Sequence, residues 1–169
     1  MKKLFIFLMA SATLMSCSKN ADTSTEEANL ATFKENSKIV LSMFKDYSNN
    51  DFSRYESTMS DSGKFVPPTI GTDTLNKAEN LKGLQALRSL QSKVNFGEIQ
   101  FLPTVDSVHY KPDGNVRVFT QWTSDGKNGA HVVNNYFAIF EFNSAHQVIL
   151  TVEYQDMGGI WKALNEVKK

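Results

Sequence analysis

The sequence predicts an α+β domain in which three N-terminal helices pack on a curved antiparallel sheet, which can curl round them and enclose a cavity. Apolar residues recur at helical spacing in the first half of the chain. After Phe96 the chain has runs rich in Val, Ile, Phe, Tyr and Thr, divided by turn residues, which indicates strands joined by hairpins. Helices followed by such a sheet are typical of the α+β class. Because 41% of the residues are hydrophobic and 12 are Phe, one core can form without a disulfide.

The chain opens with a predicted secretory signal over residues 1–16. Lys2 and Lys3 precede an apolar run from Leu4 to Leu14, which is too short to cross a bilayer as a mature helix. Cys17, the only cysteine, follows directly. The ending Leu-Met-Ser-Cys resembles the lipobox of bacterial lipoproteins, and this resemblance implies cleavage before Cys17 and acylation of its thiol and amine. The alternative is an ordinary secreted protein with a free or buried cysteine.

The lipobox resemblance implies a place in the bacterial cell envelope, with the lipid bilayer as partner through acylated Cys17 and the domain outside the cytoplasm. Ser18 follows the cysteine in place of Asp, which favours the outer membrane by the sorting rule of enteric bacteria. Small, polar and charged residues follow, so we expect a flexible tether over 17–29 and the domain over 30–169.

The charge balance excludes one class of partner. The signal contains Lys2 and Lys3 and no acidic residue, so the mature chain has 16 basic and 18 acidic residues and a net charge of −2. Nucleic-acid binding rests on clustered positive charge, and none is apparent here. The same balance provides no polybasic patch for anionic lipids, so the acyl chains would supply the membrane anchor.

The helices are predicted from periodicity and caps. The apolar residues of 30–47 form one stripe, and Asp51 is a candidate N-cap for a short helix through Met59. The Pro67-Pro68 pair marks an irregular or edge segment. Asn76 and Glu79 have the spacing of a capping box, which predicts a third helix as far as Leu90.

The strands are predicted over 99–110, 116–124, 131–142 and 148–156. Turn signals lie at 112–115, 124–127 and 143–144, so consecutive strands should pair as an antiparallel meander. Gly158-Gly159 should end the sheet, and residues 160–164 should form a terminal turn or short helix.

The strand region resembles the nuclear transport factor 2-like superfamily, and within it the SnoaL-like proteins. The resemblance is carried by the serial order of 116–122, with its Trp122, the turn 125–127, the segment 140–143 and the segment 153–156. It implies a cystatin-like α+β roll with a cone-shaped pocket between the concave face of the sheet and the helices. It does not imply one activity, because the superfamily includes isomerases, dehydratases, polyketide cyclases, binding modules and assembly domains.

Strand alternation selects the residues expected in the pocket. Counting every second residue from Val148 places Leu150, Val152, Tyr154 and Asp156 on the concave face, unless a bulge changes the alternation. The expected pocket residues are polar or aromatic groups able to orient a ligand: Tyr47, Tyr55, Trp122, Asn134, Tyr136, Phe140, Tyr154 and Asp156.

Asp156 is the catalytic candidate. A carboxylate beside aromatic walls can act as a general base, with Tyr136 or Tyr154 as proton or oxyanion partner. This is the division of labour in the isomerases of the resembling family. The alternative is that Asp156 caps the Gly158-Gly159 turn and faces water. We expect no cofactor and no metal site, because the histidines are scattered and the cysteine has no second thiol.

Three functions therefore remain open. The first is a membrane-anchored module that binds a small apolar or aromatic ligand or a protein partner. The second is a cofactor-free isomerase or dehydratase that uses Asp156. The third is a structural module that forms a homodimer through the convex face of the sheet, where Phe119, Phe137 and Ile139 are expected.

Overall fold

The computed structural model describes residues 20–166, and Cys17 and the predicted signal 1–16 lie outside this range. Its order is α1 (Asn20–Ser48), α2 (Tyr55–Thr58), β1 (Met59–Val66), β2 (Leu75–Asn76), α3 (Lys77–Ser89), β3 (Gln91–Val105), β4 (Pro112–Gly126), β5 (His131–Phe142), β6 (Val148–Tyr154) and α4 (Met157–Asn165). The α+β class with helices packed on a sheet is confirmed.

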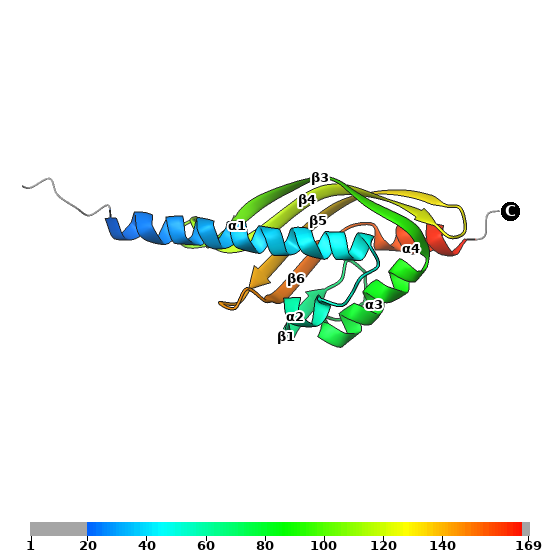
Figure 1. Cartoon of the computed structure of the whole chain (residues 1–169), viewed down its shortest axis with the longest axis horizontal. Coiled ribbons are helices and arrows are strands. Elements are labelled where there is room, and N and C mark those ends of the chain that lie inside the picture. The colour runs from blue at the N-terminus through cyan, green and yellow to red at the C-terminus, as the bar shows by residue number, and fades with distance from the viewer. Residues whose placement is uncertain (1–19, 167–169) are drawn as a thin grey trace, which may run out of the picture.

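The strands form one mixed sheet in the order β2-β1-β6-β5-β4-β3. Strands β3 to β6 make the predicted antiparallel meander, and β1 pairs with β6 in parallel. The sheet is not closed: it curves, and α1 lies along its concave side while α2 and α3 lie near the β1 end (Figure 1). The expectation of a purely antiparallel sheet is therefore wrong at β1.

Strand β1 covers residues 59–66, where no strand was predicted, and the irregular segment expected at Pro67-Pro68 follows it. Met59 and Phe65 are buried in the sheet, while the pairing with β6 shifts its register between Met59 and Lys64. Gly63 lies within this shift, where a Cβ atom would come 2.8 Å from the Ser60 carbonyl oxygen and 3.1 Å from the Val148 carbonyl oxygen. The bulge therefore requires a residue without a side chain.

Helix α1 begins at Asn20, so the part of the expected flexible tether from residue 20 to residue 29 is helical. Glu and Ala in this segment are good helix formers and continue the turns of the packed helix. The Asn29 side-chain amide donates to the Pro112 carbonyl oxygen over 2.7 Å, and the buried Asn36 amide donates to the Gly114 carbonyl oxygen over 2.8 Å. These bonds join α1 to the first residues of β4.

The capping box of α3 forms as predicted. The Asn76 side-chain oxygen accepts from the Glu79 backbone N–H over 3.0 Å, and the Glu79 carboxylate accepts from the Asn76 backbone N–H over 2.9 Å. Asp51 does not cap α2, which begins four residues later. Its carboxylate instead accepts from the Ser53 N–H in a local turn.

The hairpin between β3 and β4 turns at 106–111, earlier than the predicted turn at 112–115. The Asp106 carboxylate accepts backbone N–H groups from Val108, His109 and Lys111, which fixes the turn there. Gly114, with φ at +87°, lies instead in β4 and makes room for Thr32 of α1.

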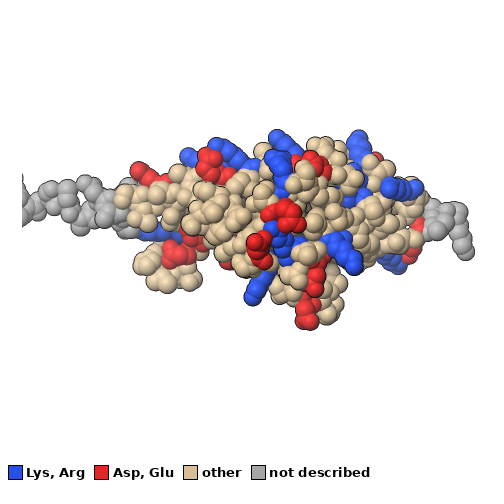
Figure 2. Space-filling view, turned by 60° about the horizontal axis from the view of Figure 1, so that its bottom comes forward, with Lys and Arg blue, Asp and Glu red and all other residues tan. Residues whose placement is uncertain are grey.

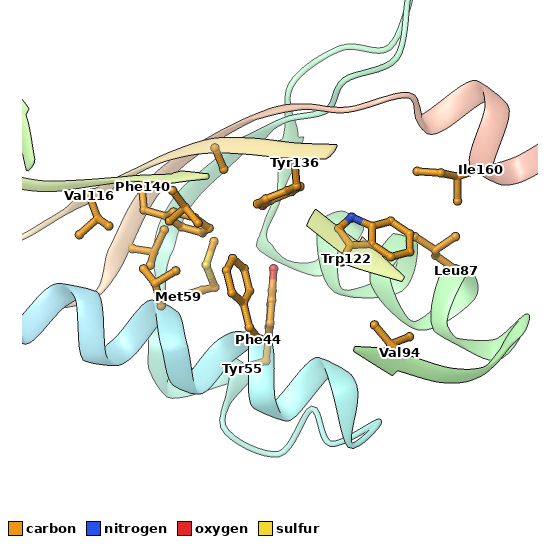
Figure 3. Packing of buried hydrophobic residues seen from close by; sticks show 14 of the residues in the cluster. Phe44, Tyr55, Met59, Leu87, Val94, Val116, Trp122, Tyr136, Phe140 and Ile160 are labelled. Atoms are coloured by element: carbon orange, nitrogen blue, oxygen red, sulfur yellow. The ribbon is translucent and has the colours of Figure 1, made fainter. Parts of the chain in front are cut away.

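One hydrophobic core fills the space between α1, α3, α4 and the concave face of the sheet. Val40, Val116 and Val118 are fully buried, and Phe44 stacks on Phe96 with 4.5 Å between the ring centroids. Phe44 from α1 also points toward Tyr136 on β5, an edge-on contact at 5.8 Å (Figure 3). The aromatic residues of this core provide the walls of the site described below.

The face of the molecule that carries α2, β1 and α3 has positive and negative side chains mixed together. Lys and Arg alternate with Asp and Glu across this face (Figure 2). Lys77, for example, pairs with both Glu56 and Asp61, at 2.9 and 3.0 Å. Within residues 20–166 no helix is long and apolar enough to cross a membrane.

Candidate functional site

A cavity of about 260 Å³ lies between the concave face of the sheet and the helices α1, α2 and α3. Its walls are mainly aromatic and apolar, with Pro67, Pro68 and Leu75 along the β1–β2 connection. Four of the lining residues come from four different elements: Phe44 from α1, Tyr55 from α2, Trp122 from β4 and Tyr136 from β5 (Figure 3). A concave apolar site with a few polar groups is the usual form of a small-molecule pocket.

Glu153 is the charged group of this cavity. It belongs to β6 and lines the wall beside Tyr136 and Gln155. The Tyr136 hydroxyl donates to Glu153 Oε1 over 2.6 Å, and the Gln155 amide Nε2 donates to Glu153 Oε2 over 3.0 Å. Each carboxylate oxygen therefore has one donor, and both donors are electrically neutral.

The orientation of Gln155 is fixed by two further donors. Its Oε1 accepts from the Trp122 indole N–H over 3.3 Å and from the Asn134 amide over 3.0 Å. An indole nitrogen can only donate, so the oxygen of the Gln155 amide must face Trp122 and its NH₂ group must face Glu153. Trp122, Asn134, Gln155, Glu153 and Tyr136 thus form one continuous network.

Burial in this apolar wall raises the pKa of Glu153 to about 7, against the lowering effect of the hydrogen bonds from Tyr136 and Gln155. The side chain keeps a partial solvent-accessible surface because it faces the open cavity, although protein atoms surround it. Burial also raises the pKa of the Tyr136 hydroxyl well above its usual value, and the neighbouring Glu153 charge adds to this effect. A carboxyl group that titrates near neutrality can accept and release protons at physiological pH.

Two other tyrosines line the cavity with their hydroxyls already bonded. The Tyr47 hydroxyl donates to Gln91 Oε1 over 3.0 Å, and burial raises its pKa. The Tyr55 hydroxyl accepts from the Asn80 amide over 2.8 Å, and burial raises its pKa to about 12. Both hydroxyls stay protonated at neutral pH and serve as fixed polar groups in the wall.

The structure places some of the residues predicted for the pocket in the cavity wall and others outside it. Five of them line the cavity: Tyr47, Tyr55, Trp122, Tyr136 and Phe140. Asn134 is buried behind the wall and acts through Gln155.

Tyr154 and Asp156 do not line the cavity, so the face predicted for β6 is wrong. Leu150 pairs with Glu141 and Val148 pairs with Phe142, which leaves Ile149 as an extra residue in the β6 strand. This bulge reverses the alternation, so that Thr151, Glu153 and Gln155 point inward and Tyr154 lies 56% exposed on the convex side.

Asp156 is exposed and caps α4, where its carboxylate accepts the Gly159 N–H over 2.9 Å. This is the alternative that sequence analysis left open for the residue. Glu153 and Gln155 were missed because the alternation was counted from Val148 through the bulge. Both lie within the segment 153–156, which carries part of the family resemblance. Membership of this segment is the sequence feature that could have indicated them as site residues.

The part of the chain that the structure describes contains no group of three His, Cys, Asp or Glu side chains placed to hold a metal ion. Glu153 has hydrogen-bond donors as neighbours and no second carboxylate or imidazole in the cavity wall.

No family model matches the chain, and no curated protein matches its sequence. Solved structures do resemble it. A protein from Bacillus subtilis, provisionally named an isomerase, is 11% identical with a TM-score of 0.65, over 81% of this chain and 99% of the other. A protein from Shewanella denitrificans OS-217, provisionally named a SnoaL-like polyketide cyclase, is 12% identical with a TM-score of 0.61, over 76% and 96% of the two chains.

A nuclear transport factor 2-like protein from Burkholderia xenovorans LB400 is similar in the same way. It is 18% identical with a TM-score of 0.58, over 78% of this chain and 97% of the other. At these identities the likeness concerns the fold and not the chemistry. The chain therefore has the nuclear transport factor 2-like fold of the SnoaL-like proteins.

Proposed function

We propose that this protein is a lipid-anchored domain of the bacterial cell envelope that binds a small, largely apolar or aromatic molecule in its cavity. The observation that carries the proposal is the cavity itself, an apolar space of about 260 Å³ with one polar network, Tyr136–Glu153–Gln155, in its wall. The aromatic walls would supply contact area, and the network would orient the ligand.

The two tryptophans of the chain provide a direct test, because Trp122 and Trp161 both line the cavity. Titration of the full chain with small neutral aromatic molecules should change the tryptophan fluorescence with a saturable curve. Leu84→Trp should weaken this binding, since Leu84 of α3 lines the cavity and a larger side chain would reduce its volume. Leu102→Trp should leave the binding unchanged, since Leu102 of β3 does not line the cavity. Equal binding by both variants would contradict a site in this cavity.

The lipid anchor is a separate part of the proposal and rests on the sequence at Cys17. Growth of the native host with a labelled fatty acid should label the wild-type protein and leave Cys17→Ser unlabelled and uncleaved. Labelling of Cys17→Ser would contradict acylation at this residue.

A second function, proton transfer on the ligand, is favoured by the 2.6 Å contact between Tyr136 and Glu153 and by the Glu153 pKa of about 7. The Glu153 carboxylate would remove a proton from a carbon next to a carbonyl group: the C–H bond breaks, an O–H bond forms on Glu153, and the electron pair moves to the carbonyl oxygen. The Tyr136 hydroxyl would then donate to that oxygen.

Hydrogen–deuterium exchange at the α-carbon of an enolisable aryl ketone tests this second function. Wild-type protein should catalyse the exchange, and Glu153→Gln should abolish it. The absence of catalysed exchange with the wild-type protein, at ketone concentrations that saturate the fluorescence signal, would remove proton transfer from consideration.

A third function, assembly through the convex face, is favoured by a row of exposed aromatic rings. Phe119 stacks on Phe137 at 4.7 Å, Phe137 stacks on Tyr154 at 5.4 Å, and Phe119 and Tyr154 are 42% and 56% exposed. The proposed partner is a second copy of the chain. Sedimentation equilibrium should show a dimer that Phe119→Ser weakens, and a monomer at high concentration would exclude it.

A further inference from the structure

Among the residues that the structure describes, the groups bonded to the Glu153 carboxylate include no cation. The residues that line the cavity include no Lys, Arg or His side chain. The Arg88 guanidinium, which is buried near Tyr47, donates instead to the carbonyl oxygens of Tyr47, Ser48 and Gln91. A carboxylate that is buried without a cation or a metal ion is costly to ionise, so a cation placed beside it would stabilise its charged form.

The groups that do contact Glu153 cannot supply a compensating charge. Tyr136 donates a neutral hydroxyl, and Gln155 donates a neutral amide that Trp122 and Asn134 hold in one orientation. The positive end of helix α4 also lies at the cavity, through Met157. Asp156 caps that end with its own carboxylate, so the helix does not offset the charge of Glu153.

The aromatic residues of the wall can contact both a cationic group and the apolar part of a ligand. Phe44, Phe96, Trp122, Tyr136 and Phe140 all face the cavity. The negatively polarised faces of aromatic rings attract ammonium groups, and the attraction is stronger where water is excluded. An anionic ligand would meet the like charge of Glu153 and would find no basic side chain in the wall.

We infer that the ligand of this cavity carries a positive charge: an amine or quaternary ammonium group, placed against the Glu153 carboxylate, on an apolar or aromatic body. This inference rests on the proposed binding function and names the chemical class of the ligand. An amine would donate hydrogen bonds to the Glu153 carboxylate and complete the network, whereas a quaternary ammonium group would act there by its charge alone. The apolar body would lie against the aromatic and apolar wall of the cavity.

Three probes of matched size separate this inference from the binding proposal. 2-Phenylethylamine, 2-phenylethanol and phenylacetate are a cation, a neutral molecule and an anion at pH 8, where Glu153 is mostly ionised. Their affinities for the full chain can be measured by titration calorimetry and by tryptophan fluorescence. Wild-type protein should bind the amine about tenfold or more tightly than the alcohol, and the anion most weakly.

The preference should depend on Glu153. Glu153→Gln, which keeps the shape of the side chain, should reduce the amine-to-alcohol ratio to about 1, whereas Glu141→Gln on β5 outside the cavity should leave it unchanged. In wild-type protein the ratio should fall as the pH drops from 8 to 5.5, because protonation of Glu153 removes the charge. This second measurement needs no variant that could fail to fold.

Each remaining outcome has a definite meaning. If the alcohol or the anion binds most tightly, or if the amine preference survives in Glu153→Gln, the inference of a cationic ligand is wrong while the binding proposal stands. If none of the three probes binds, the binding proposal fails, and the inference fails with it.

Discussion

Replacing Glu153 by Gln should make the folded protein more stable at alkaline pH, because it removes a carboxylate that is buried without a cation. The pKa of this group is about 7 in the folded protein against 4.5 for an unperturbed Glu. The folded state therefore holds this proton more tightly than the unfolded state, so the wild type is most favoured below pH 4.5 and loses stability as the pH rises from about 4.5 to about 7.

The size of this effect follows from the shift of about 2.5 pKa units. At about 1.36 kcal/mol per unit, the full penalty above pH 7 is about 3 kcal/mol, of which about 2.5 kcal/mol develops between pH 5 and pH 8. Glu153→Gln has no proton to release, so its stability relative to the wild type should increase by that amount over the same interval.

Urea denaturation followed by circular dichroism, at several pH values, measures this difference. Glu141→Gln is the matched control, since it makes the same chemical change on the neighbouring strand outside the cavity. The difference in unfolding free energy between Glu153→Gln and wild type should grow with pH at unchanged m-values, and the difference for the control should stay flat. A constant difference between Glu153→Gln and wild type at all pH values would contradict a raised pKa of Glu153 in the folded protein.

Three further predictions concern the Tyr136 contact, the buried Arg88 and the cap of α3. Tyr136→Phe removes a hydrogen bond that lowers the pKa of Glu153, so the carboxyl titration observed by ¹³C NMR should move to a higher pH, and a move to lower pH would contradict the assigned contact. Arg88→Met should cost about 3 kcal/mol in urea denaturation because three carbonyl oxygens lose their donors. The same replacement at Arg54, whose side chain is exposed, should cost far less than at Arg88. Asn76→Ala should cost about 1 kcal/mol through the lost cap of α3, and Asn76→Asp should restore most of it.

Local signals predicted most of the fold. The capping box at Asn76 forms, and β5 runs over the predicted residues 131–142, because caps and alternation depend on near neighbours in sequence. The turn before β4 was misplaced because two signals competed. Asp106 binds three backbone N–H groups, while Gly114, the stronger turn residue by type, is needed where α1 packs closely on β4.

The position of Glu153 in the site could not be predicted from the sequence, because it depends on contacts between strands that are distant in the chain. The bulge at Ile149 depends on the simultaneous pairing of β6 with β5 and with β1, and β1 lies more than 80 residues earlier in the chain. It turns Glu153 inward, where binary patterning expects an apolar residue. A charged residue held on the inner face of a sheet is a local exception of the kind that functional sites often show.

The most direct test of the central claim is a ¹³C NMR titration of the Glu153 carboxyl in the full chain, without and with saturating 2-phenylethylamine. We expect a midpoint near pH 7 in the free protein and a lower midpoint when the amine is bound, because a cation in the cavity favours the ionised carboxylate. A midpoint near 4.5 in the free protein, or one that the amine leaves unchanged, would contradict an uncompensated carboxylate at the centre of the binding site.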